Sequence, residues 1–168
     1  GLSNRFIRFP RKAAAGKALQ EQRQPVTGDL GWREFRGICH SHSTLSHDCE
    51  VPFEEILRTL NKIGADFICL SDHCDEGKAD FSVQWRGLHE GKLFIPGFEM
   101  KDGFMPFGVK SDVVLTNGTP SAILARQIID GGGVLFFAHP EETREWKLPG
   151  LTGMEIYNIQ IRRASGRE

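Results

Sequence analysis

The sequence predicts an α/β fold built on a parallel sheet or barrel. Strand-like and helix-like segments alternate from residue 50 onward. Residues with metal-binding side chains follow the ends of the strand-like segments, which is where parallel α/β sheets and barrels place their sites. A length of 168 residues, with 39% hydrophobic and 26% charged residues, suits a single globular domain.

The first predicted strand runs from Phe35 to His42. Side chains alternate along a strand, so His40 and His42 should point to the same side. Two imidazoles held on one rigid element suit a transition-metal ion. Histidines at strand ends are also common on surfaces, so this pair alone leaves a metal site and a plain surface equally open.

Two helices are predicted by apolar spacing and by end signals. One should begin at Pro52 and end before Gly64; the other, with Thr119 as its cap and Pro120 as its first residue, should end at Gly131. Their apolar stripes consist of Phe53, Ile56, Leu57, Leu60 and Ile63, and of Ile123, Leu124 and Ile128.

Four further apolar runs predict strands, and three of them end near the candidate metal ligands His73, Glu99 and His139. They are 67–70 followed by Asp72 and His73, 93–96 followed by Glu99, 134–138 followed by His139, and 154–157. Any one of these polar residues could be an ordinary surface group. Together with His40 and His42 they obey one placement rule, which favours a shared metal site.

The segments FRGICHSHSTLSHD, FICLSDH, FIPGFE and VLFFAHP resemble, in order and spacing, the metal-binding motifs of the PHP (polymerase and histidinol phosphatase) domain family. The similarity covers residues 35–157. Members of that family fold as a distorted barrel of βα units and hydrolyse phosphate esters with divalent ions. The resemblance therefore implies an α/β protein with a TIM-like (βα) barrel of the PHP type, acting as a metal-dependent phosphoesterase with manganese, zinc or iron ions.

The resemblance also implies which residues hold each ion. His40 and His42 would bind a first ion, and Glu99 would bridge it to a second ion that is also held by His139. His73 would bind a third ion. Its partner would come from the first motif, in which His47 and Asp48 both occupy a suitable position; we favour Asp48.

The reaction implied by the resemblance is metal-assisted hydrolysis, in which the ions lower the pKa of a water molecule and the resulting hydroxide attacks phosphorus. Glu99 and His139 would be catalytic through the ions that they hold. Asp72 would orient its loop or accept the second N–H of a metal-bound histidine. The cations that could hold a phosphate group are Lys101, Lys110, Arg126 and Arg144.

Two family features are missing from this sequence. Many members have a histidine between the motifs that contain Glu99 and His139, and this chain has none there. The family's closing Asp-x-His motif has no counterpart after His139. We therefore expect a barrel that is incomplete at its C-terminal end and holds fewer ions than the three that the family can bind.

The ends of the chain differ in composition from the body. Residues 1–34 are predicted to be a basic arm or extension, 35–157 the PHP-like domain and 158–168 a flexible tail. The arm has few aromatic residues, so nucleic-acid binding is a weaker expectation than a phosphorylated small molecule or nucleotide as substrate. Apolar runs near the predicted open end of the barrel lead us to expect self-association.

Composition also indicates a compartment. No apolar run approaches the roughly 18 residues that would span a bilayer, so we expect no membrane association. The four cysteines form no CxxC pair, which favours reduced thiols in a cytoplasmic protein. The chain begins with Gly1 and not methionine, which leaves export open. Two alternatives to a phosphoesterase also stay open: a non-catalytic, PHP-like metal-binding or structural domain, and a nuclease that acts on nucleic-acid ends.

Overall fold

The computed structural model describes residues 9–22, 31, 33–74, 77–140, 142 and 144–156. The chain divides into two compact units, Gly1–Glu34 and Phe35–Glu168. In the first unit, helix α1 spans Phe9–Gln22. Among the described residues, no helix is both long and apolar enough to cross a membrane. The predicted tail 158–168 lies outside the described residues.

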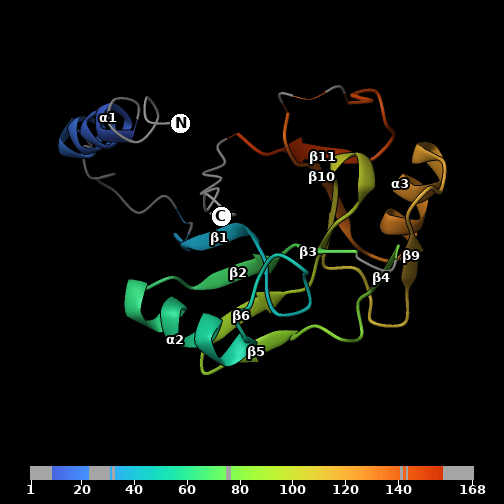
Figure 1. Ribbon diagram of the computed structural model, residues 1–168, viewed down its shortest axis with the longest axis horizontal. Coiled ribbons are helices and arrows are strands. Elements are labelled where there is room, and N and C mark those ends of the chain that lie inside the picture. The colour runs from blue at the N-terminus through green and yellow to red at the C-terminus, as the bar shows by residue number, and fades with distance from the viewer. Residues whose placement is uncertain are drawn as a thin grey trace, which may run out of the picture. The chain divides into compact units, whose positions relative to one another are not determined.

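The second unit contains a four-stranded sheet of order β1-β2-β6-β5 (Figure 1). These strands are β1 Gly37–Ser41, β2 Phe67–Leu70, β6 Lys92–Ile95 and β5 Gly87–His89. β1, β2 and β6 run parallel, and β5 pairs with β6 in the antiparallel direction. The first three strands therefore end at the same edge of the sheet.

Helix α2, Phe53–Ile63, connects β1 to β2. Its Leu60 is fully buried in a cluster with Ile68 of β2 and Phe94 of β6. The helix ends at Gly64, which has a φ of 68° and whose N–H bonds the carbonyls of Asn61 and Leu60. Glycine accepts this left-handed cap without the steric cost that a Cβ brings. The predicted helix is confirmed, with Pro52 standing at its N-cap.

Two short strands continue β2 and β6 beyond a break. β3 is Asp72–His73 and β7 is Phe98–Glu99; they pair in parallel, with His73 opposite Glu99. The sheet thus carries these two polar residues to its carboxyl edge, where β1 also ends.

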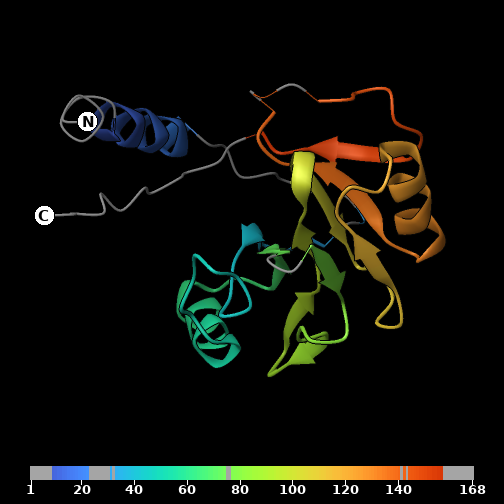
Figure 2. The same ribbon diagram turned by 45° about the vertical axis from the view of Figure 1, so that its right-hand side comes forward.

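A second layer contains the sheet β11-β10-β8 (Figure 2). Here β10 (Val134–Phe137) pairs in parallel with β11 (Leu151–Met154) and antiparallel with β8 (Phe104–Phe107). The 3₁₀ turn η2, Lys101–Gly103, leads into β8. Helix α3, Ser121–Asp130, buries Leu124, Ala125 and Ile128 in a core shared with Leu135 and Phe137 of β10. The small pair of β4 (Lys78–Asp80) and β9 (Val114–Thr116) adds Leu115 to that core.

The prediction of a TIM-like (βα) barrel of the PHP type is wrong. The described residues of this unit form short sheets with the two α-helices α2 and α3, and they form no closed barrel. A barrel of this kind needs a helical crossover between successive parallel strands. The connection from β2 to β6 instead runs through β3, β4 and β5, and β8 enters between β7 and β10 in the antiparallel direction, with Gly97 bridged to Phe107.

Glycines explain part of this difference. Gly77 and Gly91, in a bend and a turn, have φ values of 73° and 77°, and Gly87 at the start of β5 has a φ of 81°. Backbone of this kind interrupts a right-handed helix. The last predicted strand, 154–157, also needs correction. The strand instead spans Leu151–Met154, which is the stretch that pairs with β10. Tyr157 lies outside the described residues.

Candidate metal centre

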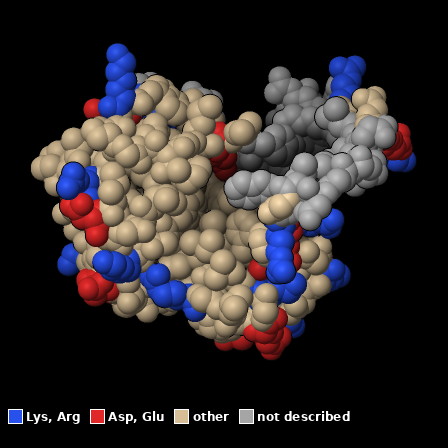
Figure 3. Space-filling model, turned by 180° about the vertical axis from the view of Figure 1, so that it is seen from behind, with Lys and Arg blue, Asp and Glu red and all other residues tan. Residues whose placement is uncertain are grey.

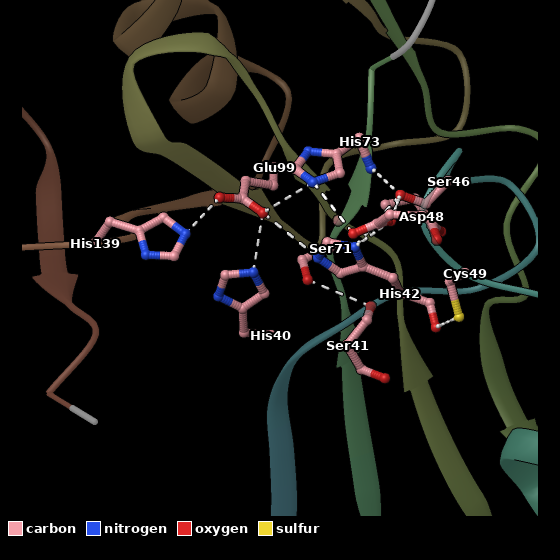
Figure 4. A network of polar contacts seen from close by, with 12 residues as sticks. His40, Ser41, His42, Ser46, Asp48, Cys49, Ser71, His73, Glu99 and His139 are labelled. Carbon is pink, nitrogen blue, oxygen red and sulfur yellow. Dashed lines mark hydrogen bonds and ion pairs between the residues drawn. The ribbon is translucent and has the colours of Figure 1, made fainter. Parts of the chain in front are cut away.

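The carboxylate of Glu99, at the end of β7, is the meeting point of four histidines (Figure 4). Its Oε1 lies 3.0 Å from His139 Nε2. Its Oε2 lies 3.0 Å from His40 Nε2, 3.4 Å from His42 Nε2 and 3.7 Å from His73 Nε2. Only 9% of the Glu99 side chain is exposed. One buried carboxylate thus lies close to the Nε2 atoms of four histidines from three separate segments.

Local backbone geometry aims two of these histidines. The register of β1 against β2 shifts between Cys39 and Ser41, and His40 between them has a φ of 70°. A β-bulge re-aims a side chain in this way. His139, just beyond β10, has a φ of 49°. Left-handed backbone at a non-glycine residue is uncommon and is often found at functional sites.

Two further carboxylates orient the histidine rings. His40 Nδ1 lies 2.9 Å from Glu155 Oε1, and His42 Nδ1 lies 2.9 Å from Asp48 Oδ1. Metal-binding histidines usually donate their second ring N–H to a carboxylate or carbonyl, which fixes the tautomer and the direction of the ligating nitrogen. Both rings therefore present Nε2 toward Glu99 in the arrangement that a metal ligand requires.

The donor atoms form two groups that share Glu99. His40, Glu99 and His139 make one group, and His42, His73 and Glu99 make the other; within each, the atoms lie within 4.8 Å of one another. Imidazole and carboxylate donors suit zinc, iron and manganese, so these residues fit such ions. The grouping differs from the expected one, in which His40 and His42 shared an ion and His73 held another.

The charges of this cluster are strongly coupled. Burial disfavours the protonated form of His42, but hydrogen bonds to Glu99 and Asp48 outweigh burial and raise its pKa to about 9. The pKa of His40 is raised in the same way, against burial, by Glu99 and Glu155. Burial would raise the pKa of Glu99, yet hydrogen bonds from His40 and His42 hold it far below its usual value. In the metal-free protein the charged forms of His42 and Glu99 therefore stabilise each other.

Both candidate partners of His73 lie beside it. Asp48 Oδ2 is 3.6 Å from His73 Nε2, and the His47 ring stacks on the His73 ring with centroids 5.0 Å apart. Asp48 also accepts a hydrogen bond from Ser46 Oγ at 2.6 Å. Burial opposes ionisation of Asp48, but the bonds from His42 and Ser46 lower its pKa to about 2. Its carboxylate is thus charged and in contact with both His42 and His73.

Asp72 lies outside the cluster of histidines. Its fully buried carboxylate accepts hydrogen bonds from the Ser43 backbone N–H and from Gln84 Nε2. Gln84 in turn bonds both the N–H and the carbonyl of Gly97. Asp72 therefore connects the loop after β1, through Gln84, to the approach to β7, and its part in the reaction stays a prediction.

Sequence reasoning missed two residues of the site. Glu155 falls inside the run 154–157 that the sequence predicted as a strand, so it was not considered as a site residue. In the structure it comes directly after β11, as His139 comes shortly after β10. It also accepts a hydrogen bond from the His139 backbone N–H at 3.3 Å. Ser46 bonds Asp48 and the His73 backbone N–H, and nothing in its spacing distinguishes it from the neighbouring serines.

A pocket of about 550 Å³ opens beside the cluster. Glu99, His73, His139 and His47 line one part of it. The remainder mixes polar and apolar groups and comes from Cys74, from Met100 and the turn η2, from Asn117 after β9 and from the loop after β10. The candidate metal ligands thus border a space of the size that small molecules occupy.

No protein-family model matches the chain, and no curated protein matches it.

Proposed function

We propose that this protein is a metal-dependent phosphoesterase. The observation that carries the proposal is the arrangement of His40 and His42, each with Nε2 directed at the buried Glu99 and Nδ1 held by a second carboxylate. The resemblance of the four motifs to the PHP family supports the reaction class. The proposed reaction class does not depend on a barrel, because the candidate ligands lie at strand ends, and the open sheets also have such ends.

The protein's own residues would bind and orient the reactants. His40, Glu99 and His139 would hold one manganese, zinc or iron ion, and His42, His73 and Glu99 a second. Such ions polarise a phosphoryl oxygen and activate a water molecule at neutral pH. In the hydrolysis, a P–O bond forms to water, the P–O bond to the alcohol breaks, and the alcohol leaves with a proton from the water.

Two alternatives receive less support. A non-catalytic binding domain needs no pocket beside its ions, whereas Glu99 and His139 line one here. A nuclease would need a basic path for the nucleic-acid backbone. On the face shown in Figure 3, basic and acidic side chains of the described residues are interspersed and form no continuous basic stripe.

The test is substitution of His42. His42→Ala removes one Nε2 donor from the cluster, so we expect loss of one bound ion and a fall in divalent-ion-dependent phosphoesterase activity by orders of magnitude. His89→Ala is the matched control, because His89 lies in β5 and stacks on Trp85. Elemental analysis and turnover of p-nitrophenyl phosphate provide the readouts. Activity that survives both chelator and His42→Ala would contradict the proposal.

A further inference from the structure

Only some of the cations that could hold a phosphate group lie at the pocket beside Glu99. Of the four that the sequence suggested, Lys101 and Arg144 line the pocket. Arg126 instead lies on the exposed face of α3, where it pairs with Asp130 at 3.0 Å. Lys110 is exposed and is not among the lining residues. Lys101 and Arg144 are therefore the candidate anion-binding residues, and Lys110 and Arg126 can serve as controls.

Lys101 stands on a turn with a fixed backbone. Its N–H donates to Asn117 Oδ1 at 3.0 Å. The next residue, Asp102, is in the left-handed region with φ 63° and ψ 18°. Among the described residues, the Lys101 ammonium makes no ion pair within 4.0 Å. Lys101 follows Glu99 by two positions in the chain, and both residues line the pocket.

Arg144 forms a fixed part of the same wall. Only 5% of its side chain is exposed. Its Nε donates to the Ala138 carbonyl at 3.1 Å, and its NH2 group lies 3.0 Å from Glu142 Oε2. A Cβ at Gly103 would come within 2.6 Å of the guanidinium. The guanidinium is thus held against the backbone of η2 and beside the residue that precedes His139.

We propose that Lys101, on the wall that Arg144 holds in place, is an anion-binding subsite that selects a small phosphate monoester as the substrate. This proposal rests on the proposed phosphoesterase function. A monoester phosphate carries two negative charges near neutral pH, and the Lys101 ammonium at the border of the pocket would pair with the charge that a diester lacks.

The experiment uses the full chain loaded with manganese or zinc. Binding of inorganic phosphate is measured by calorimetry, and hydrolysis of p-nitrophenyl phosphate is compared with that of bis(p-nitrophenyl) phosphate. For Lys101→Ala we expect phosphate affinity to fall, and KM for the monoester to rise, by about tenfold or more, the range for one charge-assisted contact. KM for the diester should change less, and metal content should not change.

Lys110→Ala and Arg126→Ala are the controls and should match the unsubstituted protein. Arg144→Lys keeps the charge but loses the planar contacts, so it should weaken phosphate binding less than Lys101→Ala does. Phosphate binding and monoester KM that are unchanged in Lys101→Ala would overturn the subsite while leaving the phosphoesterase in place. Absence of hydrolysis by the metal-loaded, unsubstituted protein would instead contradict the proposed function, and the phosphate-binding comparison would still test the subsite.

Discussion

At the scale of single residues, the candidate centre depends on carboxylates that do not all have the same task. Glu99 is shared by both groups of donors, whereas Glu155 and Asp48 each hold the Nδ1 of one histidine. Glu155 has 9% of its side chain exposed and Asp48 has 45%. Each oriented ring therefore has its own supporting acid, and the two can be tested separately.

Glu155→Gln should lower the affinity for the ion at His40, Glu99 and His139 more than the affinity for the ion at His42, His73 and Glu99. The amide keeps the size of the side chain but loses the charge that holds His40 Nδ1–H, and loss of such a supporting group typically costs 10–100-fold in metal affinity. Asp48→Asn is the matched change at His42. Titration calorimetry with zinc should show one weakened step in each variant. If Glu155→Gln lowered the affinity of both metal-binding steps equally, Glu155 and Asp48 would not each orient a separate histidine.

The affinity for metal should rise with pH. An ion can bind His42 only after its proton is released, and the pKa of His42 is about 9 in the metal-free protein. Between about pH 6 and 9 the apparent affinity should therefore increase, by up to tenfold per pH unit for each proton displaced. Calorimetry in two buffers of different ionisation enthalpy would count the released protons. An affinity independent of pH would contradict the coupling.

At the scale of secondary-structure elements, α2 shows which contacts stabilise the unit. Leu60 is fully buried against β2 and β6, whereas Ile63, on the last turn of the same helix, is 53% exposed. Both residues belong to the apolar stripe that predicted the helix. Only the sheet decides which part of that stripe is covered.

Leu60→Ala should lower the free energy of unfolding by about 2–5 kcal/mol, because it leaves a cavity between the helix and the sheet. Ile63→Ala in the same helix should cost less than about 1 kcal/mol, since little buried surface is lost. Urea unfolding followed by circular dichroism would measure both. Similar costs for the two substitutions would show that α2 does not pack as described.

At the scale of the whole molecule, the candidate metal centre joins distant parts of the Phe35–Glu168 unit. His40 lies in β1, Glu99 in β7 and Glu155 directly after β11. The contacts His40–Glu99 and His40–Glu155 connect residues 59 and 115 positions apart. Ions that bind these residues only in the folded state will stabilise the unit as a whole.

Adding zinc or manganese should therefore raise the melting temperature, by an amount equivalent to about 2.7 kcal/mol at an ion concentration 100 times the dissociation constant. The pKa of His42 is higher in the folded chain than the ordinary value of 6.5, so the stability that its ion pairs give the metal-free protein is complete below pH 6.5 and is lost as pH rises toward 9. The increase on adding metal should thus be larger at pH 8 than at pH 6. Calorimetric scans with and without chelator would measure it, and a smaller increase at pH 8 would contradict the linkage.

The sequence by itself determined the local elements and the identity of most donors. The apolar period of 53–63 and Gly64 predicted α2, and the continuous apolar run before His139 predicted β10. These features depend on neighbours in the chain, which a sequence displays directly. Only the tertiary structure decided how the strands pair: the antiparallel entry of β8 and the connection through β4 and β5 replace the expected barrel. The same long-range pairing separated His40 from His42 into different donor groups and brought Glu155 to His40, because contacts between distant segments depend on packing and not on spacing.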